Sequence, residues 1–198
     1  MKCRSNSAAH VFQDAARGTG KALFWSNRDV EDDVTDAVTS FATDGFALGD
    51  GSELSTGDVN TSSRTYVAWN WAAGNSGSSN TDGSINTTTT YVDTTAGISI
   101  STYTGTGSGA TVGHGLGVTP TTVWIFPRTV SDHHLASNWE TGISVYSEKW
   151  ILSDEDRAAS STGFVTSANS TTFTIGTDVN VNQSTTTYLA YSFVEVVG

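Results

Sequence analysis

The sequence predicts an all-β protein made of two related antiparallel β-sandwich modules, the N-terminal one incomplete, with little helix. The segment Asp58–Trp71 (DVNTSSRTYVAWNW) returns without a gap as Asn180–Phe193 (NVNQSTTTYLAYSF), so one structural unit is used twice. Both copies end in residues that alternate between two faces, as strands with one wetter face do. The chain is also rich in Thr, Ser, Gly and aromatic residues, a composition typical of strands and turns.

The repeat extends upstream in the same order. Phe46–Gly49 corresponds to Phe173–Gly176, and Lys21–Phe24 resembles Lys149–Leu152 more weakly. In each copy, the strand that ends in the glycine is expected to form a hairpin with the alternating strand that closes the copy.

The two copies differ at their beginnings. The second opens with Gly97–Tyr103 and passes through Gly113–Gly117 to an apolar strand, Thr122–Phe126. The first begins near Lys2–Arg4, which corresponds to the end of that apolar strand. We therefore expect copy one to lack its first strands. Its open edge would be covered by another chain or by the segment Ile85–Tyr103, through β-strand addition.

These correspondences divide the chain into three parts. Residues 1–74 form the partial module of copy one, residues 75–96 a Gly/Ser/Thr-rich linker, and residues 97–198 the complete module of copy two. Within copy one, Asp29–Phe41 has valines at helical spacing and could form one short helix. An acidic loop is an equally good interpretation, because Val and Thr are weak helix formers.

The net charge of -11 at pH 7 argues against a nucleic-acid-binding surface, which requires clustered Lys and Arg. No stretch approaches the roughly 20 apolar residues that span a bilayer, and the N-terminus has no hydrophobic signal core. These features predict a soluble protein. The single cysteine, Cys3, excludes an internal disulfide and is expected to be an inert strand residue.

Histidines and acidic clusters are the candidates for metal binding. His133 and His134, with His10 or His114 as a remote third ligand, could bind a transition metal, but neighbouring strand residues point to opposite sides. Solvated polar loops remain the better interpretation, so no cofactor is predicted and Ca²⁺ is kept only as a weak alternative. Two acidic clusters without the spacing of an EF-hand could supply its oxygen ligands: Asp29, Glu31, Asp32 and Asp33, and Asp154, Glu155 and Asp156.

No catalytic residue is predicted, because the sequence has no nucleophile elbow and no phosphate-binding loop. Carboxylates that face each other across a cleft, as glycoside hydrolysis requires, cannot be identified from sequence. Gly105–Gly109 is interpreted as a turn between strands, and His114, flanked by glycines, as the mark of another tight turn.

The six tryptophans are the candidates for surface contacts, since exposed aromatic rings stack on sugars and anchor protein interfaces. Trp25 and Trp139 lie beside polar loops and are the candidates for an outward-facing surface that meets a glycan or a protein. The other four in strand-like segments are expected in the core or in subunit contacts: Trp69, Trp71, Trp124 and Trp150.

These motifs resemble a repeat domain of marine tailed-phage virion structural proteins of the tail or fibre type. The resemblance implies a setting in a phage particle and supplies no catalytic residues. In copy two it rests on Thr102–Gly107, Thr111–Pro120, Trp124–Ile125 and Thr187–Glu195, and in copy one on Lys2–Ser5, Arg17–Leu23, Asp44–Gly49 and Tyr66–Trp71.

The expected function is therefore that of a non-enzymatic virion structural protein, made in the bacterial host cytoplasm. It would be a homo-oligomer, with a trimer as one form, exposed on the particle surface and associated with the tail or its fibres. Its expected partners are other virion proteins and a host surface glycan, without nucleic acid or membrane. One alternative is a capsid decoration protein that clamps neighbouring capsid subunits, and a second is a glycan-cleaving tail enzyme.

Overall fold

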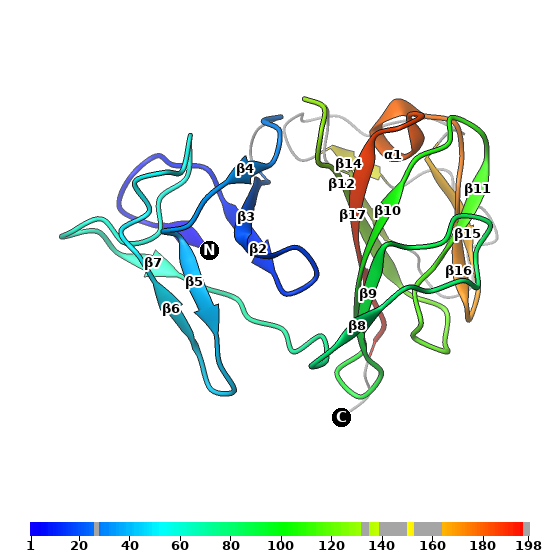
Figure 1. Cartoon of the computed structure of the whole chain (residues 1–198), viewed down its shortest axis with the longest axis horizontal. Coiled ribbons are helices and arrows are strands. Elements are labelled where there is room, and N and C mark those ends of the chain that lie inside the picture. The colour runs from blue at the N-terminus through cyan, green and yellow to red at the C-terminus, as the bar shows by residue number, and fades with distance from the viewer. Residues whose placement is uncertain (26–27, 132–134, 139–149, 153–163, 196–198) are drawn as a thin grey trace. The chain divides into compact units, whose positions relative to one another are not determined.

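The computed structural model describes all residues except 26–27, 132–134, 139–149, 153–163 and 196–198. The described residues form antiparallel strands and one four-residue helix, which confirms the all-β prediction with little helix. The chain divides into two compact units, Met1–Asn70 and Trp71–Gly198 (Figure 1). Within the described part of the chain, no helix is long and apolar enough to cross a membrane.

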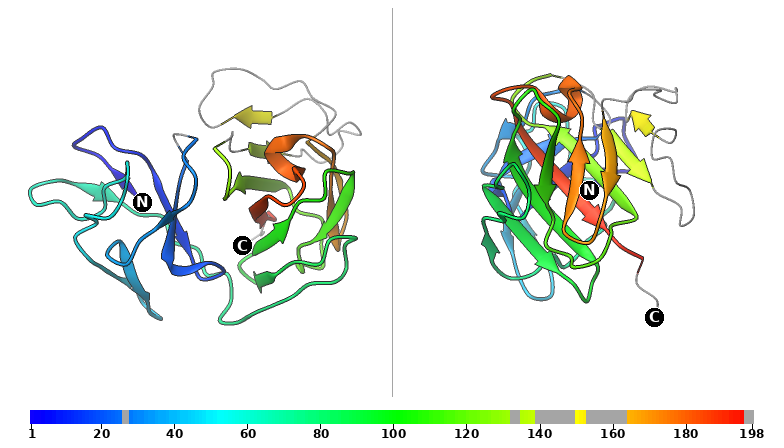
Figure 2. Two further views of the ribbon diagram at one scale, coloured as in Figure 1. Left: turned by 45° about the horizontal axis from the view of Figure 1, so that its top comes forward. Right: turned by 90° about the vertical axis from the view of Figure 1, so that its right-hand side faces the viewer.

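Unit 2 is a sandwich of two sheets. The larger has the strand order β14-β13-β12-β17-β10-β9-β8, and the smaller has the order β11-β16-β15. The smaller sheet lies in front of the larger one in the right-hand view of Figure 2. The strands are β8 (Gly77–Ser78), β9 (Thr89–Asp93), β10 (Ile98–Thr104), β11 (Ala110–Gly113), β12 (Thr122–Pro127), β13 (Leu135–Asn138), β14 (Trp150–Leu152), β15 (Val165–Ala168), β16 (Thr172–Ile175) and β17 (Thr187–Phe193).

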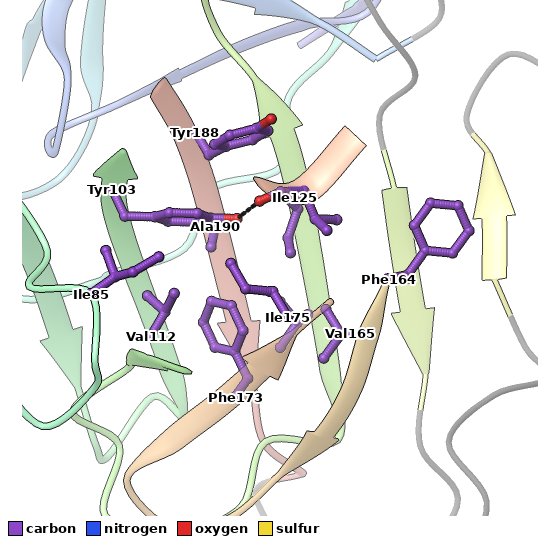
Figure 3. Packing of buried hydrophobic residues seen from close by; sticks show 12 residues of the cluster. Ile85, Tyr103, Val112, Ile125, Phe164, Val165, Phe173, Ile175, Tyr188 and Ala190 are labelled. Carbon is purple, nitrogen blue, oxygen red and sulfur yellow. Dashed lines mark hydrogen bonds between the residues drawn. The ribbon is translucent and has the colours of Figure 1, made fainter. Parts of the chain in front are cut away.

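Alternation along β17 explains how the larger sheet contributes to the core of unit 2. Tyr188 and Ala190 point between the sheets, where the hydroxyl of nearby Tyr103 donates a hydrogen bond to the carbonyl of Val181 at 2.7 Å (Figure 3). Each large apolar side chain buried there contributes roughly 1.5–3 kcal/mol. The cluster consists of Ile85, Tyr103, Val112, Val123, Ile125, Phe164, Val165, Phe173, Ile175, Val181, Tyr188 and Ala190.

The helix α1 (Val179–Asn182) precedes β17. Asp178 caps its N-terminus, because the Asp178 carboxylate accepts a hydrogen bond from the Asn180 N–H at 2.9 Å. Val181 in this turn is fully buried and packs into the core, which ties the turn to the space between the sheets.

Unit 1 contains three small sheets, with the orders β1-β7, β2-β3-β4 and β5-β6. Its strands are β1 (Lys2–Cys3), β2 (Val11–Asp14), β3 (Gly18–Phe24), β4 (Asp32–Asp33), β5 (Val38–Phe41), β6 (Phe46–Leu48) and β7 (Tyr66–Val67). Cys3 is a fully buried strand residue, as predicted. The core cluster of this unit is Val11, Ala22, Phe24, Val34, Ala37, Leu54 and Val59.

The segment predicted as a linker, residues 75–96, is arranged differently. It contains β8 and β9, which are strands of the larger sheet of unit 2. Ile85 also donates a backbone hydrogen bond to Thr111 and packs into the unit 2 core. The segment Ile85–Tyr103 therefore completes unit 2, and the hypothesis that it covers the open edge of copy one is wrong.

The hairpin predicted within each copy does not form either. β6 pairs with β5 and β7 pairs with β1, so the two predicted partners lie in different sheets. In unit 2, β16 and β17 are likewise in different sheets. In both units, the segment that connects these two strands crosses from one sheet to the other. Strands that are close in the sequence therefore need not pair.

No helix forms in Asp29–Phe41, for which the sequence allows either a short helix or an acidic loop. The segment contains β4 and the whole of β5, joined by a bend. Val34 is buried in the unit 1 core whereas Val30 is 43% exposed, so the valines do not share one buried helical face. The low helix propensity of Val and Thr is consistent with this outcome.

Candidate assembly interface

The repeated sequence has the same strand register in both units. In β5–β6, Val38 lies opposite Leu48 and a bulge follows Val38. In β15–β16, Val165 lies opposite Ile175 and a bulge follows Val165. Bulges are specific features of a strand pair, so their recurrence at one position supports a common module.

The beginning of copy one also has its counterpart at the predicted place. Cys3 of β1 lies opposite Tyr66 of β7, and Pro127 at the end of β12 lies opposite Tyr188 of β17. Just beyond these strands, the N–H of Arg4 donates to the Thr65 carbonyl at 2.7 Å. The N–H of Arg128 donates to the Thr187 carbonyl at 2.8 Å. β1 is thus the structural equivalent of the end of β12.

An asparagine after the buried valine ties the crossing segment to the small hairpin in each unit. The Asn60 side-chain amide donates to the Gly49 carbonyl at 2.8 Å, and the Asn182 amide donates to the Gly176 carbonyl at 2.7 Å. Asn182 is completely buried, and its amide also donates to the Ser108 carbonyl at 2.6 Å. Asn60 is exposed.

A carboxylate organises the corresponding turn in unit 1. Asp58 is buried and accepts hydrogen bonds from the Tyr66 hydroxyl at 2.5 Å and from Arg64, which also forms an ion pair with it. Burial by itself raises the pKa of Asp58, but the hydrogen bonds from Tyr66, Arg64 and Thr61 outweigh it and lower this pKa to about 2. Asp58 therefore stays ionised at neutral pH.

The units differ in what flanks the repeated closing strand. In unit 2, β17 lies between β10 and β12 and pairs with β10 along seven residues. In unit 1, β7 pairs only with β1 among the described residues. The exposure of equivalent residues reflects this difference, since Trp69 is 61% exposed whereas Tyr191 is 5% exposed.

The second sheet is open at the corresponding place. β16 pairs with both β11 and β15, whereas β6 pairs only with β5 among the described residues. Unit 1 therefore presents unpaired strand edges where β10 and β11 lie in unit 2. We call residues 46–48 and 64–70 the open edge of unit 1.

Aromatic rings cluster on the face of the larger unit 2 sheet that points away from the core. Trp71 packs edge-on against Trp124 and Phe193, with ring centroids 6.4 and 5.9 Å apart. Trp124 and Phe193 are 4.9 Å apart, and Tyr191 contacts both. Trp71 is 51% exposed, so part of this aromatic cluster is on the surface. Such a cluster is typical of contact surfaces.

The two tryptophans predicted as surface contacts are not brought together in the described structure. Trp25 is half-buried and stacks on Phe12 with ring centroids 5.9 Å apart. Trp139 lies outside the described residues. Trp69 and Trp71, which were expected in the core or in subunit contacts, are the two tryptophans with the greatest described exposure. The sequence signal for the exposure of Trp69 is that residues 1–57 contain no match to Gly97–Tyr103, the segment that includes the neighbour of β17.

The first acidic cluster does not converge on a single point. Glu31 binds the buried Arg17 at 3.0 Å, and Arg17 also binds Asp14 at 2.6 Å. Elsewhere in the cluster, the Asp32 carboxylate accepts from the Ser55 N–H at 2.9 Å, Asp29 accepts from the Thr56 hydroxyl at 3.2 Å, and Asp33 forms an ion pair with Lys21. The second cluster, at 154–156, lies outside the described residues.

The histidines are also dispersed where they are described. The ring of buried His114 accepts a hydrogen bond at Nδ1 from the Leu116 N–H at 3.1 Å. Nε2 lies 3.1 Å from the Asn169 carbonyl, to which it donates as the N–H tautomer. His133 and His134 lie outside the described residues, within which no group of three or more metal-ligating side chains gathers.

The sequence matches, over residues 1–198, a family described as a domain of unknown function, DUF7483. No curated protein and no solved structure matches the chain.

Proposed function

We propose that this chain, which belongs to the DUF7483 family, is a non-enzymatic structural protein of a phage particle. It assembles as an oligomer through its β-sandwich modules and is associated with the tail or its fibres. The observation that carries this proposal is the open edge of unit 1, which repeats a strand that is buried between two neighbours in unit 2.

An open strand edge favours assembly for a physical reason. Its backbone N–H and C=O groups form hydrogen bonds with a neighbouring chain as readily as with their own sheet. The aromatic cluster of unit 2 adds a second surface of the kind that anchors protein interfaces or stacks on sugar rings. Several such weak contacts act together in a particle where the protein is present in many copies.

The phage setting is supported by the resemblance of the repeated motifs to virion structural proteins. An attachment role on the tail would use the aromatic cluster to contact host glycans, whereas a decoration role on the capsid would use both surfaces to bridge capsid subunits. The two roles differ in copy number. A decoration protein is present in hundreds of copies and a tail protein in far fewer.

The test is a measurement of copy number in purified particles by quantitative mass spectrometry, together with the mass of the isolated protein by light scattering. We expect an oligomer in solution, held by surfaces other than the open edge, and a low copy number in the particle. A high copy number assigns the protein to capsid decoration. A compact monomer that is absent from particles contradicts the proposal.

A further inference from the structure

We infer that the open edge of unit 1 binds a strand–turn–strand segment of another polypeptide, one whose sequence resembles residues 98–113 of this chain. We call this segment the hairpin, although its two strands, like β10 and β11, join different sheets and do not pair with each other. The inference rests on the proposed function, since an assembling structural protein meets such a partner in its particle. It adds the chemistry of that partner: a polar hairpin with a tyrosine before a Gly-x-Gly turn.

Unit 2 provides the template for this complex. There, β10 pairs with β17 and β11 pairs with β16, so one hairpin adds a strand to each of the two sheets. The corresponding strands of unit 1 are β7 and β6, whose outer edges are open within the described residues. A single hairpin of the same length therefore fits both edges at once.

The backbone groups that would receive the hairpin can be identified by position. In unit 2, the Gly105 N–H donates to the Thr186 carbonyl at 2.8 Å, and the Val194 N–H donates to the Gly97 carbonyl at 2.9 Å. The backbone N–H and C=O groups of the even-numbered residues of β17 thus point toward β10. Their counterparts in unit 1 are Arg64, Tyr66, Ala68 and Asn70, of which all but Tyr66 are exposed.

The receptor for the hairpin turn is also preformed in unit 1. In unit 2, the side-chain oxygen of Asn182 accepts from the Thr106 N–H and its backbone carbonyl accepts from the Gly107 N–H, both at 2.8 Å. The Thr185 N–H donates to the Gly105 carbonyl at 3.1 Å. Thr185 holds its N–H there with a positive φ of 68°.

The unit 1 counterparts have the same backbone conformation. Ser63, which corresponds to Thr185, has a φ of 65°, although a positive φ is uncommon for residues other than glycine. Asn60, which corresponds to Asn182, is exposed and holds its side chain in place by its bond to Gly49. The turn site is therefore organised before any hairpin binds.

An aromatic contact supplies the apolar part of the interface. In unit 2, the ring of Tyr103 stacks on Tyr188 with centroids 5.2 Å apart, and both rings are buried. The unit 1 counterpart of Tyr188 is Tyr66, which is half-buried. A tyrosine at the matching place in the partner would stack on Tyr66 and bury it.

Residues 98–113 of this chain are not themselves assigned as the occupant, because they already form part of unit 2. Residues 98–104 and 110–113 are paired on both sides or packed within unit 2, and Tyr103 is in its core. Donating them to a second copy of the chain would require unit 2 to open. A partner with an independent hairpin of this type avoids that cost.

The test uses a synthetic peptide of residues 98–113 as the probe, titrated into the full chain by calorimetry and followed by amide hydrogen exchange. We expect saturable binding with one peptide per chain. At a free peptide concentration about ten times the Kd, exchange should slow by about tenfold at residues 64–70 and 46–48. Absence of binding, or protection confined to other residues, overturns the inference.

Two variants make the test specific. In the peptide, Gly105→Val should abolish binding. In unit 2, a Cβ added at Gly105 would collide with the carbonyl of Gln183. Thr61 is the unit 1 counterpart of Gln183, so its carbonyl would meet the valine in the same way. In the protein, Ala68→Pro removes an N–H on the open side and should weaken binding about tenfold or more. Ala68→Ser, which keeps the N–H, is the matched control. Equal binding by the proline and serine variants overturns the inference.

The remaining outcomes separate this inference from the proposed function. If the protein without peptide self-associates and Ala68→Pro abolishes that association, the occupant is a second copy and the inference is overturned. A protein present in particles that does not bind the peptide contradicts this inference alone. A protein that binds the peptide but is absent from particles contradicts the proposed function alone.

Discussion

Tyr66 and Tyr188 make the same hydrogen bond in the two units. Each hydroxyl accepts from the backbone N–H five residues earlier, Thr61 in unit 1 and Gln183 in unit 2, at 2.8 Å in both cases. The Tyr188 hydroxyl also donates to the Val179 carbonyl at 2.5 Å. This arrangement resembles the tyrosine corner of sandwich folds, in which a tyrosine near the start of a strand fixes the preceding turn.

Tyr188→Phe should lower the free energy of unfolding of unit 2 by about 1–3 kcal/mol, because it removes the hydroxyl of a buried tyrosine that accepts from the Gln183 N–H and donates to the Val179 carbonyl. Denaturant unfolding followed by segment-resolved hydrogen exchange measures the loss. Tyr91→Phe is the control, since Tyr91 is a half-buried tyrosine of β9 whose hydroxyl has no hydrogen bond within the described residues. Equal losses in both variants would show that the corner bond does not stabilise the unit.

The two repeated asparagines should respond very differently to the same substitution. Asn182→Asp should destabilise unit 2 by about 3 kcal/mol, since it replaces two donated hydrogen bonds by a buried charge facing carbonyl oxygens. Asn60→Asp should cost unit 1 only about 1 kcal/mol, because Asn60 is exposed and its side-chain amide makes one such bond. Similar costs for the two variants, measured by denaturant unfolding, would contradict the difference in burial between the two sites.

Among the charged residues of unit 1, Arg17 should be the one whose substitution lowers the stability of the unit most. Arg17→Met should destabilise the unit by about 3–5 kcal/mol, because Asp14 and Glu31 would remain buried without their cation. Lys21→Met is the matched control and should change stability by about 1 kcal/mol or less, as the Lys21–Asp33 pair is exposed. A small loss of stability for Arg17→Met in thermal unfolding would show that water reaches the carboxylates of Asp14 and Glu31.

The stability of unit 1 should fall at acid pH because of Asp58. Its folded pKa of about 2 lies below the unfolded value near 3.8, so its stabilisation is complete above about pH 4 and is lost as pH falls through about 2. Asp58→Asn should be less stable at neutral pH and should lack this part of the acid dependence. Unfolding of both proteins between pH 2 and pH 7 measures the difference, and parallel curves would rule out the assignment.

His114 should make the stability of unit 2 depend on pH in a higher range. Burial lowers the pKa of His114 below its usual 6.5, although the Asn169 carbonyl and Asp82 oppose this shift. The unfolded chain then binds the proton more readily, so stability is complete above about pH 6.5 and decreases as pH falls below it. His114→Gln should flatten this dependence. An NMR titration of His114 that gave an unshifted pKa would contradict the prediction.

The repeat made much of the architecture predictable. The alternation in Tyr188–Phe193 predicted a strand of the right extent, and the correspondence of Lys2–Arg4 with the end of the apolar strand predicted the equivalence of β1 and the end of β12. These features depend on local side-chain periodicity and on equivalence between two parts of one chain. Both are present in the sequence itself.

Strand partners were not predictable in the same way. Residues 46–48 and 66–67 are close in sequence but lie in different sheets, and residues 75–96 have the composition of a linker but contribute two strands to unit 2. Pairing is decided by the free energy of burying whole faces, which adds contributions from distant segments. Local composition carries little information about that sum.

The sequence by itself determined that the protein is all-β and that it uses one module twice. Only the tertiary structure decided that Ile85–Tyr103 belongs to unit 2, that Trp69 is exposed, and that the acidic side chains around Glu31 bind separate partners. The physical reason is the range of the interactions. Side-chain periodicity acts between near neighbours, whereas exposure and pairing depend on which distant segments exclude water from one another.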